Sequence, residues 1–104
     1  PDTSTTATIE AVSTDTYTVC PSGQNTGVVT VSSALTLNAY PTSVNEIAYA
    51  EIVLDVATGA TVTAGTNLTL VDTPTAGKRN ICVCRWSGGK CKLYVTIVED
   101  LPQA

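Results

Sequence analysis

Four cysteines are the most chemically versatile residues in this sequence. Cys82, Cys84 and Cys91 lie close together, whereas Cys20 stands apart, directly before Pro21. Four cysteines allow three full disulfide pairings, and their spacing does not choose among them. Two alternatives stay open: buried free thiols in a reducing compartment, and at least one disulfide. The 104-residue chain has no CxxC pair and no histidine, so we expect no metal site.

The remaining polar residues do not form a catalytic arrangement. Without histidine the chain lacks the usual acid or base of neutral pH. Glu51 and Asp55 fall on one face of an expected strand, where we expect both to face solvent. Their separation of about 13 Å is wider than that of paired glycosidase carboxylates. Residues 75–79 lack the first glycine and the final hydroxyl residue of a phosphate loop. We therefore expect no enzymatic activity and no cofactor.

Charge is distributed unevenly along the chain. The net charge of −4 argues against nucleic-acid binding. Residues 1–77 carry seven acids and no base (−7), whereas residues 78–104 carry five bases and two acids (+3). The five basic residues could therefore form an anion-binding patch for a sulfated or phosphorylated surface polymer. Trp86 and Tyr94 could stack against a sugar. The alternative is that the basic residues keep a sheet edge soluble and that Trp86 belongs to the core.

The residue pattern predicts an all-β fold. Threonine and valine, which are both β-branched, are frequent, and apolar residues alternate with polar ones. Ala50, Ile52 and Leu54, for example, share one face of an expected strand. Turn residues recur about every eight to twelve positions, which predicts an antiparallel β-sandwich or jelly roll of seven to eight short strands. No apolar run approaches the roughly 18 residues of a membrane-spanning helix.

The C-terminal region predicts a β-hairpin that turns at Gly88-Gly89, since glycine accepts positive φ at both turn positions. This register sets Trp86 opposite Cys91. Cys84 and Cys91 are then diagonal neighbours about 7–8 Å apart at Cα, beyond comfortable disulfide reach. A turn at Ser87-Gly88 would instead place them directly opposite. The first register predicts one apolar face, formed by Cys82, Cys84, Trp86, Cys91, Leu93 and Val95.

The chain is expected to be a single domain over residues 1–104, with residues 1–6 as a flexible lead-in. Because the first residue is proline rather than methionine, we expect a processed product or a fragment of a longer protein. Asn67 begins an N-glycosylation sequon, which matters only if the protein is secreted by a eukaryote.

Five runs carry a resemblance to a known family: residues 49–55, 61–70, 75–80, 85–89 and 93–95. Over residues 28–98 the pattern resembles the small β domains of bacteriophage tail fibres and head fibres. The resemblance implies a non-enzymatic structural protein of the virion, a fibre, appendage or decoration subunit that contacts the host cell surface. It implies a homo-oligomer, with a trimer favoured, whose partners are other virion proteins and a host surface polysaccharide. No functional residue carries over from the family, but host contact would come from loops such as residues 85–92, with Trp86, Lys90 and Lys92 as the candidate contacts.

A different class of protein is the alternative. The chain would then be a small secreted disulfide-bonded protein, such as a fungal-type surface protein, an effector or a killer-toxin-like polypeptide. Its even cysteine count, its threonine and serine content and the sequon at Asn67 fit that class. An inhibitor or binding module on the same fold is a third possibility, because a fold does not determine a function.

Overall fold

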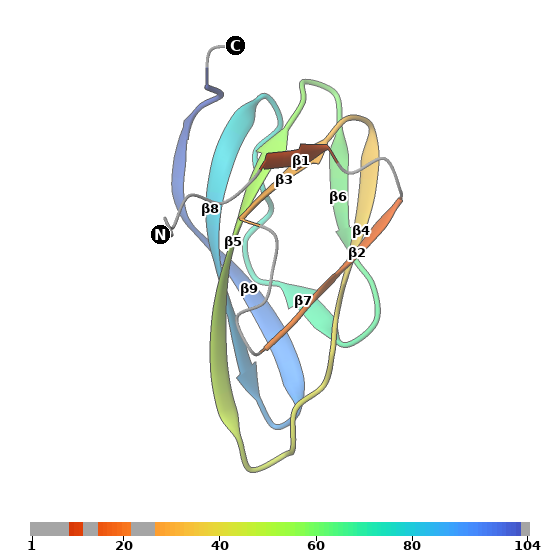
Figure 1. Cartoon of the computed structure of the whole chain (residues 1–104), viewed down its shortest axis with the longest axis vertical. Coiled ribbons are helices and arrows are strands. Elements are labelled where there is room, and N and C mark those ends of the chain that lie inside the picture. The colour runs from red at the N-terminus through yellow and green to blue at the C-terminus, as the bar shows by residue number, and fades with distance from the viewer. Residues whose placement is uncertain (1–8, 12–14, 22–26, 103–104) are drawn as a thin grey trace, which may run out of the picture.

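A computed structural model describes residues 9–11, 15–21 and 27–102. Within them the chain forms nine β-strands and no helix (Figure 1). The strands are β1 (Ile9–Ala11), β2 (Thr16–Val19), β3 (Val28–Val31), β4 (Ala34–Ala39), β5 (Ile47–Val56), β6 (Thr61–Ala64), β7 (Leu68–Leu70), β8 (Lys78–Ser87) and β9 (Lys90–Asp100). The all-β prediction is confirmed, with nine strands in place of seven to eight. The expected lead-in at residues 1–6 lies outside the described residues.

The strands form two sheets. The larger sheet has six strands in the order β1-β3-β5-β8-β9-β7, and the smaller sheet has three in the order β2-β4-β6. Figure 1 shows β5, β8 and β9 on one side of the molecule and β4 and β6 on the other. No described residue belongs to a helix long and apolar enough to cross a membrane.

Successive strands from β1 to β7 alternate between the two sheets, and this alternation decides their direction. The chain leaves the larger sheet after each odd-numbered strand, crosses to the smaller sheet, and returns. A strand and the next strand in the same sheet therefore run the same way. The pairs β1/β3, β3/β5, β2/β4 and β4/β6 are all parallel.

The prediction of an antiparallel arrangement is therefore wrong for five of the seven strand pairs among the described residues. Only β5/β8 and β8/β9 are antiparallel, whereas β7 pairs with β9 in parallel. The physical reason is that alternation of apolar residues shows which face of a strand is buried, but not which strand lies beside it. Short turns such as Ser32-Ser33 connect the two sheets instead of closing hairpins.

The connecting turns stack on one another and continue the sheets' hydrogen bonds. The amide of Ala57 donates to the carbonyl of Val31 at 3.0 Å, and that of Thr61 donates to Ser33 at 2.9 Å. The turn between β5 and β6 thus lies on the turn between β3 and β4. This stacking satisfies backbone groups that a sheet-to-sheet connection would otherwise leave without partners.

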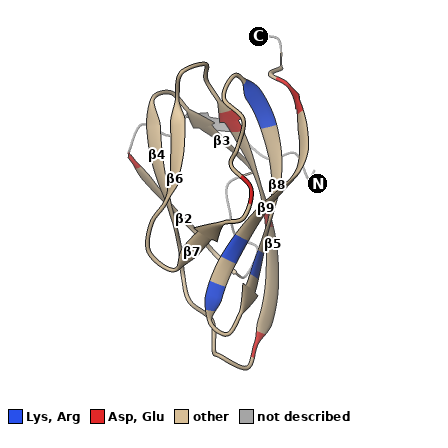
Figure 2. Ribbon diagram, turned by 180° about the vertical axis from the view of Figure 1, so that it is seen from behind, with Lys and Arg blue, Asp and Glu red and all other residues tan. Residues whose placement is uncertain are grey.

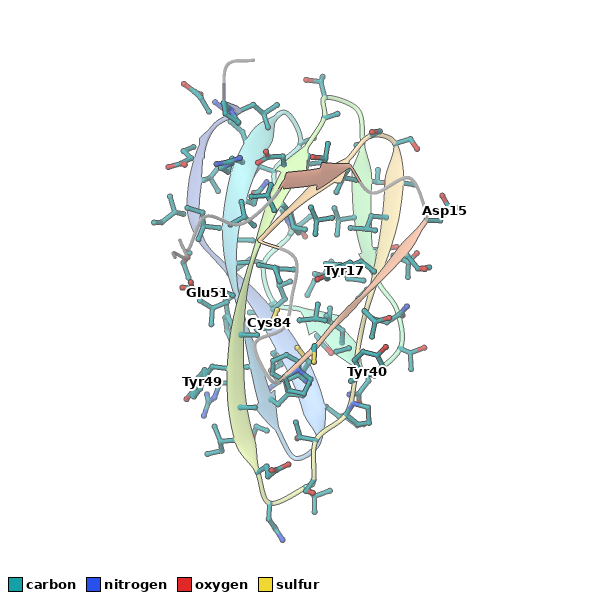
Figure 3. All side chains as sticks on the ribbon, in the orientation of Figure 1. Asp15, Tyr17, Tyr40, Tyr49, Glu51 and Cys84 are labelled. Carbon is teal, nitrogen blue, oxygen red and sulfur yellow. The ribbon has the colours of Figure 1, made fainter. Side chains whose placement is uncertain are left out.

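The core contains side chains from both sheets. The smaller sheet contributes Val19, Leu35, Leu37, Ala39 and Val62, and the larger sheet contributes Val29, Val31, Ala50, Ile52, Leu54, Val56, Leu68, Cys82, Cys84, Trp86, Cys91 and Leu93. Along β5 the predicted alternation is confirmed, because Ile52 and Leu54 are fully buried while Glu51 is exposed. In Figure 3, Tyr49 and Glu51 project from β5 away from Cys84 and the core.

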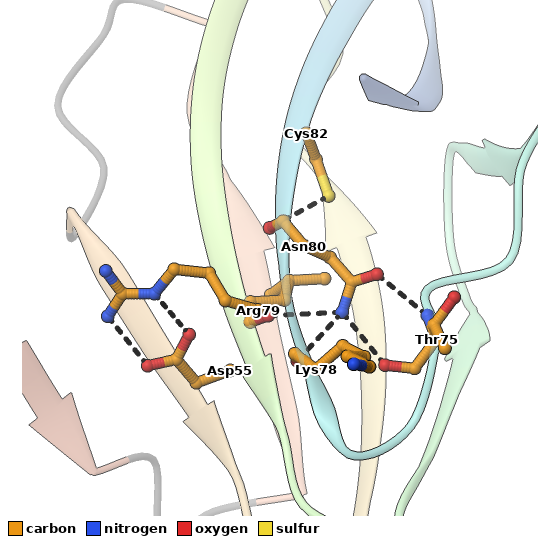
Figure 4. A network of polar contacts seen from close by, with 7 residues as sticks. Asp55, Thr75, Lys78, Arg79, Asn80 and Cys82 are labelled. Atoms are coloured by element: carbon orange, nitrogen blue, oxygen red, sulfur yellow. Dashed lines mark hydrogen bonds and ion pairs between the residues drawn. The ribbon is translucent and has the colours of Figure 1, made fainter. Parts of the chain in front are cut away.

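Asn80 is a fully buried polar residue that ties the loop before β8 to the larger sheet (Figure 4). Its Oδ1 accepts a hydrogen bond from the amide of Thr75 at 2.8 Å. Its Nδ2 lies within donating distance of the carbonyls of Thr75 (3.0 Å), Lys78 (3.1 Å) and Leu54 (3.4 Å). Because a buried amide is costly unless it is paired, these contacts indicate a structural role.

Replacing Asn80 with alanine should lower the free energy of unfolding by about 2–4 kcal/mol, since the loop backbone of Thr75 and the buried carbonyl of Leu54 would lose a partner and the buried amide would leave a cavity. The measurement is urea unfolding followed by the fluorescence of the single tryptophan. Asn38→Ala is the matched control. Asn38 also accepts from a loop amide, that of Thr66 at 2.6 Å, but it is only partly buried, so water can replace it and we expect a loss of about 1 kcal/mol or less. Equal losses in the two variants would contradict this role.

Candidate binding surface

The β8–β9 hairpin has the register that the sequence predicts. Trp86 lies opposite Cys91 and Cys84 opposite Leu93, with the turn at Gly88-Gly89. Five of the six residues of the predicted apolar face are buried, and the sixth, Val95, packs against the core. This prediction is confirmed.

The hairpin turn depends on two glycines in the left-handed region. The φ angles of Gly88 and Gly89 are 67° and 83°. The carbonyl of Gly89 accepts from Asn67 Nδ2 at 3.0 Å and from the amide of Thr42 at 3.4 Å. The turn is therefore held by two loops as well as by its own strands.

Trp86 belongs to the core and is not a surface contact. Its relative exposure is 0%, and its indole Nε1 donates to the carbonyl of Tyr40 at 2.7 Å. The prediction of Trp86 as a contact for a surface ligand is wrong in this fold, because the register points the indole inward. Lys90 and Lys92 are exposed, and their part in binding remains a prediction.

The basic residues form two groups at opposite ends of β8 and β9 (Figure 2). Near the hairpin turn Arg85 pairs across the strands with Lys92, and Lys90 follows at the tip. At the other end Lys78 forms an ion pair with Asp100 at 2.7 Å. That contact lowers the pKa of Asp100 below its ordinary value, first through the hydrogen bond from Lys78 and then through its charge.

Asp55 is a buried ion-pair partner, and the expectation that it faces solvent is wrong. Its carboxylate is 8% exposed and accepts two hydrogen bonds from Arg79, at 2.7 Å from Nε and 2.9 Å from Nη2. The Asp55 hydrogen bond raises the pKa of Arg79 above its ordinary value. A carboxylate held on both oxygens by a guanidinium stabilises the sheet, since bidentate pairs are among the stronger polar contacts.

Cys82, Cys84 and Cys91 are buried free thiols. A hydrogen bond joins the thiols of Cys84 and Cys91, which raises the pKa of Cys84 and lowers that of Cys91. Burial, together with the charge of Asp72, raises the pKa of Cys82 to about 12. The described residues contain no cluster of three or more side chains that could hold a metal ion.

Asn67 is partly buried in the turn before β7 and adopts a φ of 63°. The Nδ2 atom that a glycan would modify is the atom that donates to Gly89. The side chain therefore has a structural role in the folded chain. Its glycosylation stays a prediction that depends on secretion.

A shallow hollow of about 260 Å³ is lined by Pro21, Pro41, Thr42, Glu46 and Ala48. Its only ionisable group is Glu46, whose Oε1 accepts from the amide of Ser43 at 3.0 Å. That carboxylate therefore caps a turn, and the rest of the lining has few groups that could orient a ligand.

The outer face of the larger sheet carries three of the seven exposed large apolar side chains in the described part of the chain. We use "outer face" for the outward residues of three adjacent strands: Ile47, Tyr49, Glu51, Val53 and Asp55 on β5, Arg79, Ile81, Val83, Arg85 and Ser87 on β8, and Lys90, Lys92, Tyr94, Ile97 and Glu99 on β9. Ile47, Tyr49 and Ile97 are 64%, 60% and 50% exposed. Exposed large apolar residues gathered on one face are typical of protein contact surfaces.

Fold and surface together define an all-β protein of two sheets with an exposed, partly apolar sheet face. Comparisons with models of protein families, with curated proteins and with solved structures give no match.

Substituting Gly89 with alanine should destabilise the protein by about 2–3 kcal/mol. The new Cβ would meet the backbone carbonyl of Thr42 at 3.0 Å, in addition to the strain of a positive φ. Gly88→Ala is the matched control, because its φ is also positive but nothing lies within 4 Å of the new Cβ, so we expect a loss of about 1 kcal/mol. Urea unfolding of both variants measures the difference, and a larger loss in Gly88→Ala would contradict the turn geometry.

The buried thiol of Cys82 should make the fold sensitive to alkali. Because its pKa is about 12 in the folded chain against 9.0 ordinarily, the unfolded chain releases this proton first as the pH rises. Stability should therefore be full below pH 9.0 and fall between 9.0 and about 12. Urea midpoints across that range, compared with those of Cys82→Ala, isolate this contribution. Parallel curves for the two proteins would contradict it.

Proposed function

We propose that this protein is a non-enzymatic structural subunit, a β-sandwich domain that assembles with further protein copies in a virion appendage, fibre or decoration. The exposed apolar residues of the outer face carry the proposal. The core is complete without them, since the inner faces of the two sheets already bury each other's side chains. The fold therefore does not require apolar residues at Ile47, Tyr49 and Ile97, which are exposed. A contact with another protein would bury them and would explain why they are apolar.

Three further features support a structural role. The bidentate Asp55–Arg79 pair and the hydrogen bonds of Asn80 stabilise the fold. Free buried thiols suit assembly in a reducing cytoplasm. The exposed Lys90 and Lys92 at the hairpin tip remain available for a host surface polysaccharide. The pattern resemblance of residues 28–98 to phage fibre domains is the reason for naming the virion.

A secreted protein is the second candidate, and Cys84 and Cys91 favour it, because their side chains interact and lie on neighbouring strands of one hairpin. In an oxidising compartment such a pair can become a disulfide after a small backbone adjustment. The intact mass of the natural protein, with and without alkylation, separates the candidates. Four alkylated thiols on one unmodified chain favour the virion subunit. Missing hydrogens or added hexoses favour secretion.

The purified chain should self-associate, because the exposed apolar side chains of the outer face are removed from water only when another copy covers them. Light scattering over a concentration series should show a mass rising from 10.7 kDa towards a multiple of it. Tyr49→Ser should weaken association. Val44→Ser is the matched control, since Val44 is 71% exposed in the turn before β5 but lies off the outer face. A strict monomer at every concentration would contradict the assembly role.

A further inference from the structure

The loop between β4 and β5 and the turn between β8 and β9 meet at one end of the molecule. Figure 1 shows both at the lower end of the vertical long axis. The amide of Thr42 donates to the carbonyl of Gly89 at 3.4 Å, so the loop lies against the hairpin turn. We use "apex" for this end, which comprises residues 40–49 and 85–92.

A closed turn at the apex presents an apolar side chain to solvent. The amide of Glu46 donates to the carbonyl of Ser43 at 3.0 Å, and the amide of Ser43 donates to Oε1 of Glu46 at 3.0 Å. Val44 is the second residue of this turn and is 71% exposed. Turns favour residues that fix φ, accept positive φ or bond to their own backbone, and valine does none of these. The turn therefore does not explain why residue 44 is apolar.

Three more large apolar side chains lie around Val44. Ile47 begins β5 and is 64% exposed, and Tyr40 and Tyr49 are 56% and 60% exposed. In Figure 3 the two tyrosines lie on opposite sides of the molecule at a similar height. The apex thus holds four of the seven exposed large apolar side chains of the described residues. It is apolar at its extremity, with a tyrosine on either side.

The apex is also positively charged. Arg85 pairs across the strands with Lys92, and both lie in the row of Tyr49, with Lys90 nearer the turn. None of the three cations forms an ion pair within the described part of the chain. Like charges directly opposite each other on neighbouring strands are destabilising, and a bound anionic group would offset that repulsion. Glu46 is the one carboxylate of the apex, so three bases and one acid give it a charge of +2 in a chain of net charge −4.

We propose that the apex binds the surface of a lipid bilayer that contains anionic head groups, with the long axis of the molecule upright on the membrane. Val44 and Ile47 then reach the boundary of the acyl chains. Tyr49, Arg85 and Lys92 lie at the level of the head groups, where tyrosine is common and bases attract anionic lipids. Ile47 and Tyr49 are two residues apart, about 7 Å along the strand. That distance fits the shallow insertion, about 5–10 Å, of interfacial segments.

Charge and apolar exposure together indicate lipid. The polysaccharide proposed above for Lys90 and Lys92 accounts for the cations, but it would leave Val44 in water. Apolar side chains at the extremity gain burial only against hydrocarbon or an apolar protein surface, and the cations favour hydrocarbon that lies beneath anionic head groups. The inference goes beyond the assembly role, because the loop of residues 40–46 lies off the outer face.

Co-sedimentation of the full chain with vesicles tests this proposal. The vesicles consist of phosphatidylcholine alone, or of equal parts of phosphatidylcholine and phosphatidylglycerol. We expect binding to the mixed vesicles that falls as salt is added, and binding at least about tenfold weaker to phosphatidylcholine alone. A chain that does not bind the mixed vesicles would overturn the proposal.

Variants separate insertion from attraction by charge alone. Val44→Ser removes an apolar side chain from the turn and should lower the partition coefficient on mixed vesicles about fivefold. Lys92→Gln should lower it by a similar factor, about fivefold. Glu46→Gln should raise it, because glutamine keeps the oxygen that accepts from Ser43 and removes the negative charge. Binding of Val44→Ser equal to that of the wild type would overturn insertion and would leave a site for an anionic polymer held by charge.

Val98→Ser and Lys78→Gln are the matched controls at the far end of the larger sheet. Val98 is 47% exposed, and Lys78 forms an exposed ion pair with Asp100. Neither variant should change vesicle binding, and losses equal to those at the apex would overturn the assignment of this surface. The fluorescence of the buried Trp86 without vesicles shows that each variant is folded.

Light scattering keeps this proposal apart from the assembly role. Val44→Ser should lose vesicle binding while self-association persists, because Val44 lies off the outer face. A chain that associates but does not bind vesicles would retain the assembly role and overturn the lipid-binding apex. A chain that binds vesicles but stays a monomer at every concentration would do the reverse.

Discussion

The structure depends on burying the inner faces of two sheets with small side chains and one large one. The chain has no phenylalanine or methionine, so the core consists of valine, leucine, isoleucine, alanine and cysteine around Trp86. Trp86 is fully buried near the turn of the β8–β9 hairpin, and its indole nitrogen donates to the carbonyl of Tyr40. A core of small residues needs close approach of the sheets, and this single contact between distant segments helps to fix that approach.

The alternation of the chain between the sheets follows from the same constraint. A strand that buries one face needs a second sheet on the other side of the core. From β1 to β7 the short turns of this sequence take the chain there directly. The parallel ladders are a consequence of repeating that step. The antiparallel β8–β9 hairpin closes the sheet differently, because the positive φ angles of Gly88 and Gly89 permit a tight two-residue turn.

The polar side chains discussed above form two sets: some stabilise the fold, and others lie on its surface. Asn80 holds the loop before β8, and the Asp55–Arg79 pair joins β5 to β8 at the end of these strands far from the hairpin turn. Arg85, Lys92 and Glu99 lie on the outer face and do not contribute to the core. That separation, together with the exposed Tyr49 and Ile97, is the observation on which we base the proposed assembly role.

The sequence by itself determined which residues of β5 and of the β8–β9 hairpin face inward, because side chains alternate strictly along a strand and Gly88-Gly89 sets the register. It could not determine strand direction or sheet order, since those depend on which strands meet through space. The predicted register already put Trp86 on the apolar face, and the tertiary structure decided for the core against a surface role. Only the tertiary structure paired Asp55 with Arg79, 24 residues apart. The outer face also needed the structure, because the bulge in β9 that aligns Ile97 and Glu99 with Lys92 leaves no local signal in the residue types.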